Sequence, residues 1–220
     1  MSDINGGNFE IATWYDTWNE RGLLHLKTRS VPLGYATRYN LAFAKLSPAP
    51  EGGYTVEMTG QYADAVKQAI LNQAKNAAIF VGLGDDGIPE AVADNNANHN
   101  RSTNNIVAWL NGGGYSGVSI DAESQAMRFV AEFVTQLGPS FEAAGLKIAV
   151  SVPWPVRGPT AFYGPGAVQA FNAHVAVLEL QDYSAAGTPS DVPVWIEAGV
   201  SAGLLMGGRL HRERPVSDVA

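Results

Sequence analysis

The stretch Gly113-Gly114-Tyr115-Ser116-Gly117-Val118-Ser119-Ile120-Asp121-Ala122-Glu123 joins a short apolar run to two acidic residues. The run predicts a buried strand, in which residues two positions apart share a face, so Asp121 and Glu123 are expected to emerge side by side. Neighbouring carboxylates repel, and one of them tends to hold its proton near neutral pH. Acid catalysis of glycosidic bond cleavage requires such a group. The alternative is a strand end with two solvated acids.

The composition restricts the classes of protein and partner. The 220 residues are 46% hydrophobic, enough for one sizeable core, and a single domain is expected. The net charge of −7 and the absence of a basic stripe argue against a nucleic-acid partner. No apolar run approaches the ~20 residues of a membrane span. The chain has no cysteine, which excludes disulfides, thiol catalysis and thiolate metal sites.

The N-terminal residues 1–7 lack the basic and apolar regions of a signal peptide. The protein is therefore expected to be secreted if a leader was removed, and cytoplasmic otherwise. Residues 1–8 are expected to form a flexible segment, followed by one barrel domain over 9–220.

Short apolar or β-branched runs alternate along the chain with helix-like segments. Strands are predicted at 9–15, 39–46, 78–83, 147–153, 175–183 and 203–210, and in the run that ends at Glu123. Helices are predicted at 64–77, 102–110, 124–144 and 191–202, with Gly145 ending the third of these. The segment after the second strand reads as a Pro/Gly-rich loop, and 84–100 as a loop or ragged helix start.

This alternation is typical of parallel βαβ units and predicts a TIM-type (β/α)8 barrel, whose functional residues lie at the C-terminal ends of the strands. No glycine-rich phosphate fingerprint follows the first strand. The Gly82-to-Gly87 segment is acidic and repels phosphate. Only seven strands are found before Ala220, so the barrel is expected to be incomplete near the eighth.

Residues 116–123 read Ser-Gly-Val-Ser-Ile-Asp-Ala-Glu. The segment resembles the Asp-Gly-x-Asp-x-Asp-x-Glu motif on the fourth strand of family 18 glycoside hydrolases, the chitinases and endo-β-N-acetylglucosaminidases. Its final Asp-x-Glu is intact, whereas Ser116 and Ser119 replace the first two aspartates. Further landmarks of that family follow in order at 14–19, 40–44 and 80–84. Gln181-Asp182-Tyr183 resembles the Gln-x-Tyr of strand six in hevamine-like chitinases.

The resemblance implies substrate-assisted retaining hydrolysis without a cofactor, a known exception to the two-carboxylate scheme. Glu123 would protonate the leaving oxygen, and the substrate's N-acetyl carbonyl would attack the anomeric carbon. Asp121 would orient the acetamide, and Tyr183 would donate a hydrogen bond to it. A serine at 119 can still hydrogen-bond but cannot carry the charge of the family's aspartate.

The partner implied is an oligosaccharide or polysaccharide that contains N-acetylglucosamine, most simply chitin. The residues expected to contact it are Gln181, Ser119, Trp154, Tyr15 and Trp14, although the aromatic ones fit a barrel core equally well. The four histidines are scattered and predict no metal site. Two alternatives stay open. One is a non-catalytic barrel that binds glycan or protein, and the other is an endo-β-N-acetylglucosaminidase for peptidoglycan or N-glycans.

Overall fold

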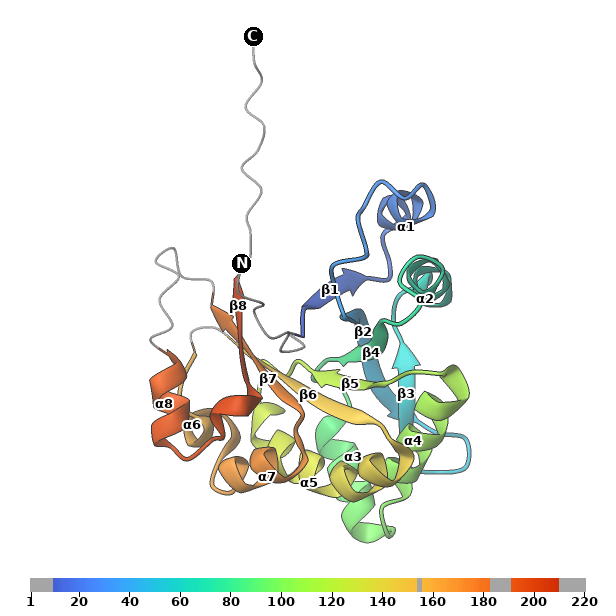
Figure 1. Cartoon of the computed structure of the whole chain (residues 1–220). Coiled ribbons are helices and arrows are strands. Elements are labelled where there is room, and N and C mark those ends of the chain that lie inside the picture. The colour runs from blue at the N-terminus through green and yellow to red at the C-terminus, as the bar shows by residue number, and fades with distance from the viewer. Residues whose placement is uncertain (1–9, 154–155, 183–190, 210–220) are drawn as a thin grey trace.

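One eight-stranded sheet organises the residues that the computed structural model describes, 10–153, 156–182 and 191–209. Seven strands run parallel in the order β1-β2-β4-β5-β6-β7-β8 (Figure 1). Their bounds are β1 Ala12–Asp16, β2 Arg38–Pro48, β4 Ala78–Leu83, β5 Gly117–Ile120, β6 Lys147–Val152, β7 Val177–Asp182 and β8 Leu205–Arg209. The eighth strand, β3 (Tyr54–Met58), lies off this path and pairs antiparallel with β2.

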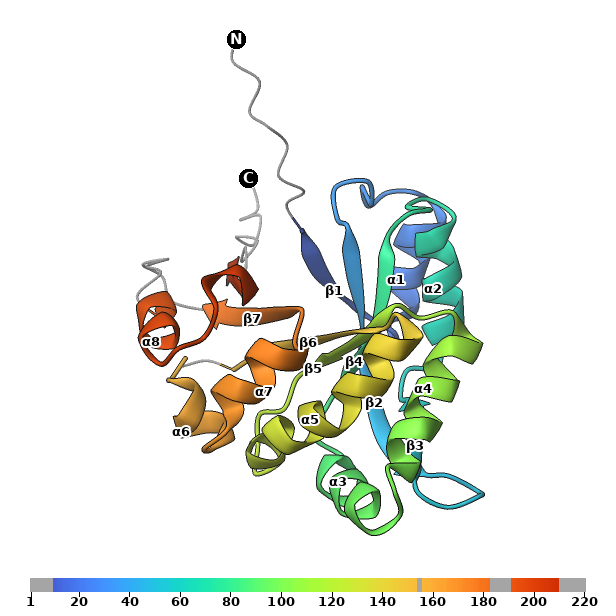
Figure 2. The same ribbon diagram turned by 60° about the horizontal axis from the view of Figure 1, so that its bottom comes forward.

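Helices connect the parallel strands and lie along one side of the sheet, as Figure 2 shows. They are α1 Glu20–Lys27, α2 Ala63–Leu71, α3 Ile88–Ala97, α4 Arg101–Gly113, α5 Met127–Ala144, α6 Pro159–Tyr163, α7 Ala167–His174 and α8 Asp191–Glu197. Within the described ranges, none of them has the length and apolar character needed to span a membrane.

The parallel sheet curves into part of a barrel, with β1 and β8 as its two end strands (Figure 1). No pairing joins β1 to β8 in the described part of the chain. The prediction of a TIM-type barrel that is incomplete near the eighth parallel strand is therefore confirmed.

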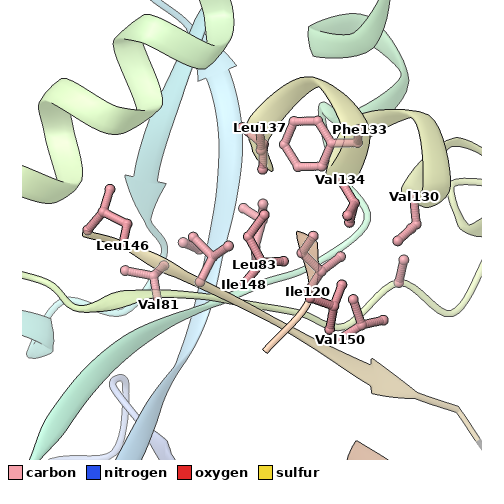
Figure 3. Close-up of a cluster of buried hydrophobic side chains, with 14 of the residues drawn as sticks. Val81, Leu83, Ile120, Val130, Phe133, Val134, Leu137, Leu146, Ile148 and Val150 are labelled. Carbon is pink, nitrogen blue, oxygen red and sulfur yellow. The ribbon is translucent and has the colours of Figure 1, made fainter. Parts of the chain in front are cut away.

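The outer face of the sheet packs against the helices and forms the main core. In Figure 3, side chains of β4, β5 and β6 meet an apolar face of α5. The labelled buried residues from α5 are Val130, Phe133, Val134 and Leu137, and those from the strands include Val81, Leu83, Ile120, Ile148 and Val150. Burying each such side chain contributes about 1.5–3 kcal/mol, so this face holds the strands in place.

The inner face of the same strands carries small and polar side chains. Because side chains alternate along a strand, Ser119 points inward between the outward Val118 and Ile120. Phe80, Ala149 and Val177 form a small separate apolar cluster on the inner face. The helices therefore stabilise the barrel from outside, and the inner face is available for polar chemistry.

Five elements differ from the sequence-based prediction, among them α6 and α7, for which no helix was predicted. The structure has α1, which was not predicted and whose start is capped by the Asn19 side chain, an acceptor for the backbone N–H groups of Arg21 and Gly22. Helix α3 forms most of the 84–100 segment, for which a loop or a ragged helix start was predicted, and it begins after Gly87, which has a positive φ. The predicted loop after β2 contains β3, because the turn around Gly52 and Gly53 closes a hairpin.

Candidate active site

Asp121 directly follows β5 and lies at the C-terminal end of the parallel strands. The side-chain amide of Gln181, on β7, donates from Nε2 to Asp121 Oδ1 at 2.9 Å and to Ser151 Oγ at 2.5 Å. Ser151, on β6, is fully buried, and its hydroxyl also hydrogen-bonds to the Asp121 carboxyl. Three adjacent strands thus fix the orientation of one carboxyl group.

The pKa of Asp121 is raised to about 6. Burial is the largest cause because it disfavours the charged carboxylate, and the negative charge of Glu123 is the second. The hydrogen bonds from Ser151 and Gln181 act in the opposite direction, and the charge of Glu179 adds a further rise. The expected electrostatic coupling between the two acids of the opening motif is therefore present, and Asp121 changes charge in mildly acidic solution.

Glu123 lies in the loop after β5, and its side chain is exposed to solvent. The backbone N–H groups of Glu123 and Ser124 both donate to Asp85 Oδ1, at 3.0 Å and 3.3 Å. Asp85 follows β4, the strand next to β5, so its carboxylate clamps the loop that carries Glu123. Sequence reasoning missed this clamp, whose only signal is an acidic residue at the C-terminal end of a neighbouring strand.

A second acidic group, Glu179 of β7, lies inside the barrel. Its carboxylate accepts hydrogen bonds from side chains of β1, β2 and β5. The donors are Trp14 Nε1 at 3.0 Å, Arg38 Nη1 at 2.5 Å, Asn40 Nδ2 at 3.1 Å and Ser119 Oγ at 3.2 Å. Glu179 is only 8% exposed and Arg38 is 1% exposed. This cluster joins residues up to 165 positions apart and was not predicted from the sequence.

Arg38 completes the cluster at the start of β2. Its guanidinium pairs with Glu10 through Nε, donates to Asn40 Oδ1 at 2.9 Å, and lies 4.9 Å from the ring centroid of Phe80. A buried charge must be paired and hydrogen-bonded to be tolerated, and here the guanidinium and the Glu179 carboxylate supply each other's counter-charge.

Trp14 projects from β1 into the barrel interior above Gly82. A Cβ added at Gly82 would lie 2.4 Å from Trp14 Cζ3 and 3.1 Å from the Leu41 carbonyl oxygen. Gly82 therefore provides the space in which the indole reaches Glu179.

Replacing Gly82 by alanine is expected to reduce the free energy of unfolding by about 1–3 kcal/mol, the usual cost of overpacking. Urea denaturation measures this change. Gly84→Ala is the matched control, because its added Cβ would meet only the Ala44 carbonyl oxygen, at 3.8 Å. Equal effects of the two substitutions would contradict the close contact between Gly82 and Trp14.

Aromatic side chains also mark the surface at the end of β1. Trp18 is 52% exposed, and its ring stacks on Phe43, with centroids 6.1 Å apart and planes inclined by 12°. Phe43 in turn contacts Trp14, at 5.6 Å between centroids. An exposed indole backed by a second ring is a rigid apolar platform of the kind on which a sugar ring stacks. Trp18 lies within the 14–19 landmark but was not among the residues expected to contact a glycan.

The structure brings some of the predicted site residues together and separates one of them. Asp121 and Gln181 hydrogen-bond to each other, and Ser119 and Trp14 meet at Glu179. Tyr15 lies elsewhere: its hydroxyl donates to the Gly22 carbonyl oxygen of α1, and its ring packs on the outer core. As a neighbour of Trp14 on one strand, it faces the opposite side. Trp154 and Tyr183 lie outside the described residues.

Within the described ranges, no three His, Cys, Asp or Glu side chains are grouped so that they could hold a metal ion.

No family model and no curated protein matches this sequence. Solved structures do match. The GH18 chitinase ChiB of Flavobacterium johnsoniae has a TM-score of 0.66 at 18% identity, over 89% of this chain and 66% of its own. A Nicotiana tobaccum class V chitinase, solved with NAG4, has a TM-score of 0.65 at 12% identity, over 89% and 65%. The spore cortex-lytic enzyme SleL of Bacillus megaterium has 0.62 at 11% identity, over 95% and 53%.

This chain thus spans about two thirds of the length of the two chitinases and about half that of SleL. At these identities the likeness concerns the fold. The half-barrel of parallel strands and outer helices is the fold of part of a GH18 chitinase.

Proposed function

We propose that this protein is a glycoside hydrolase that cleaves β-1,4-linked N-acetylglucosamine polymers with retention of configuration at the anomeric carbon. The observation that carries the proposal is the arrangement of Asp121, which is fixed by Gln181 and Ser151 and electrostatically coupled to Glu123 at the C-terminal end of the strands. The fold shared with GH18 chitinases supports it.

In this proposal, Glu123 gives its proton to the glycosidic oxygen as the bond from that oxygen to the anomeric carbon breaks. The acetamide carbonyl oxygen of the same sugar forms a bond to the anomeric carbon, giving a cyclic oxazolinium ion. Water then attacks this carbon and returns a proton to Glu123, and the acetamide is restored. Both carboxylates follow one short strand and cannot flank a sugar from opposite faces, which favours a nucleophile supplied by the substrate.

Asp121 supports the positive charge that develops on the acetamide. Its ionised carboxylate would accept the acetamide N–H and stabilise the oxazolinium ion electrostatically. Gln181 and Ser151 hold the carboxyl group before the substrate arrives, so little reorganisation is needed during the reaction. Tyr183 remains the proposed donor to the acetamide oxygen.

The exposed ring of Trp18 is the proposed platform for a sugar ring away from the scissile bond. Its stacking on Phe43, which contacts Trp14 in turn, keeps the indole in place at the end of β1. Trp14 itself donates a hydrogen bond from Nε1 to Glu179 and supports this platform from beneath.

The direct test is to incubate the protein with a soluble chitin oligomer and follow the products by proton NMR. We expect shorter oligomers whose new reducing end is initially the β-anomer. A cello-oligosaccharide is the matched control, because it has the same linkage but lacks the acetamide nucleophile, and it should not be cleaved. An α-anomer as first product would contradict the substrate-assisted route.

The other outcomes distinguish the alternatives. Binding of the chitin oligomer without any turnover would overturn the hydrolase proposal and identify a glycan-binding barrel. Cleavage of peptidoglycan or a high-mannose glycan in place of chitin would retain the chemistry and change the substrate. The printed name of one structural neighbour, a spore cortex-lytic enzyme, is the reason to include peptidoglycan in the panel.

A further inference from the structure

The interior of the barrel has two successive layers of polar contacts between β5 and β7. On β5, Ser119 precedes Asp121 by two positions, and on β7, Glu179 precedes Gln181 by two positions. Residues two apart share a strand face, so both pairs face the interior. Asp121 contacts Gln181 in one layer, and Ser119 contacts Glu179 in the layer beneath.

Glu179 is surrounded by hydrogen-bond donors. A guanidinium, an amide N–H₂ group and an indole N–H all point to its two oxygens. The Ser119 hydroxyl lies within hydrogen-bond distance of the same carboxyl group. The carboxylate accepts all four contacts, and the Arg38 guanidinium supplies its counter-charge.

We infer that Glu179 is a positioning residue of the site: its buried carboxylate orients the Ser119 hydroxyl in the layer beneath Asp121 and places a negative charge below the Asp121 carboxyl. A buried ion pair is often no more stabilising than apolar side chains of similar volume. Stability alone therefore does not explain the position of the Arg38–Glu179 pair inside the barrel. This pair lies directly below the Asp121 layer, where its negative end, Glu179, is connected to β5 by Ser119.

The charges around Asp121 set the direction in which its pKa is expected to shift. Glu123 faces it from the loop after β5 and Glu179 from β7, and both raise its pKa. The phenol of Tyr163, on α6, is electrostatically coupled to the same carboxyl. Arg38 of β2 is paired with Glu179, which nevertheless raises the pKa of Asp121.

The role of Glu179 rests on the proposed function only where it concerns catalysis, so its test uses a readout that needs no substrate. The carboxyl carbons of Asp121 and Glu179 are followed by NMR in the whole chain as pH is changed. In Glu179→Gln, the midpoint of Asp121 is expected to fall by about half a pH unit, because a like charge has been removed. In Glu123→Gln it should fall further, since Glu123 is the larger of the two charge effects.

Glu142→Gln is the matched control. It removes one negative charge from the exposed side of α5, which packs on the outer face of the sheet, and should leave the Asp121 midpoint unchanged. An unchanged midpoint in Glu179→Gln, beside a fall in Glu123→Gln, would overturn the inference and leave Glu179 as a structural ion-pair partner.

Removing one member of a buried ion pair can prevent folding, so a second variant keeps the inference testable. The double variant Arg38→Met/Glu179→Gln leaves no unpaired buried charge and should also lower the Asp121 midpoint. An unchanged Asp121 midpoint in the folded double variant would contradict the inference.

The two proposals fail in different ways. If hydrolysis occurs, the acidic limb of the kcat/KM profile should shift with the Asp121 midpoint in Glu179→Gln. If the wild type cleaves no glycan but the midpoint still shifts, the proposed function is wrong and the effect of Glu179 on Asp121 stands.

Discussion

Replacing Glu123 by glutamine is expected to lower kcat on a chitin oligomer by roughly 10²–10⁴-fold, the usual contribution of a general acid. Glutamine keeps the length of the side chain but has no proton to give to the leaving oxygen. The exposed side chain lies in a loop that is held through backbone N–H groups by Asp85, so the substitution should leave the fold and the clamp intact. Initial rates of oligomer cleavage measure the effect.

The leaving group provides an internal check on this role. An aryl glycoside of the same sugar releases a stable phenolate that needs little protonation, so Glu123→Gln should lose much less activity on it than on the oligomer. Asp86→Asn, an exposed acid near Asp85, is the charge control and should retain wild-type rates on both substrates. Equal losses on the aryl glycoside and the oligomer would argue against Glu123 as the proton donor.

Replacing Asp121 by asparagine is expected to reduce kcat/KM by roughly 10²–10³-fold on both types of substrate. The loss is of the size seen when a group that stabilises developing charge is removed, and it does not depend on the leaving group. The asparagine still has a carbonyl oxygen for the Gln181 amide, so the local hydrogen bonding can persist. Rates on the oligomer and on the aryl glycoside should therefore fall in parallel.

The pH profile identifies the same residue. Because the pKa of Asp121 is raised to about 6, the acceptor for the acetamide N–H is lost as the pH falls through this value. We expect wild-type kcat/KM to decrease by up to about tenfold per pH unit below it. The profile of Asp121→Asn should lack this limb, and an acidic limb of unchanged midpoint in the variant would assign it to another group.

The sequence predicted the elements whose signals are local. The apolar face of the helix over 124–144 and its end at Gly145 match α5 closely, and Gly145 has the positive φ that a helix-ending glycine adopts. The helix start at Asn19 and the hairpin around Gly52 also have local signals, but short segments of mixed composition carry them, and both elements were missed. The alternation of strands and helices along the sequence was sufficient to predict the barrel architecture.

The site residues show the same difference between local signals and tertiary structure. Asp121 was selected because it lies at the end of a predicted strand, where a barrel places its functional groups. Gln181 was selected from the Gln-x-Tyr resemblance, in which it shares a strand face with Tyr183. Tyr15 was selected for its ring alone. The structure places it on the helix-covered side, because a strand sends neighbouring residues to opposite faces and Trp14 takes the inner one.

What the sequence determined by itself is the strand that leads into Asp121 and Glu123, the spacing of these acids, and the parallel architecture around them. What only the tertiary structure decided is which distant groups meet these acids. The Asp85 clamp and the Glu179 cluster connect positions 38 to 165 residues apart. Their contacts depend on the register and curvature of the assembled sheet, which the helices fix by packing on its outer face, and no pattern within a single strand contains that information.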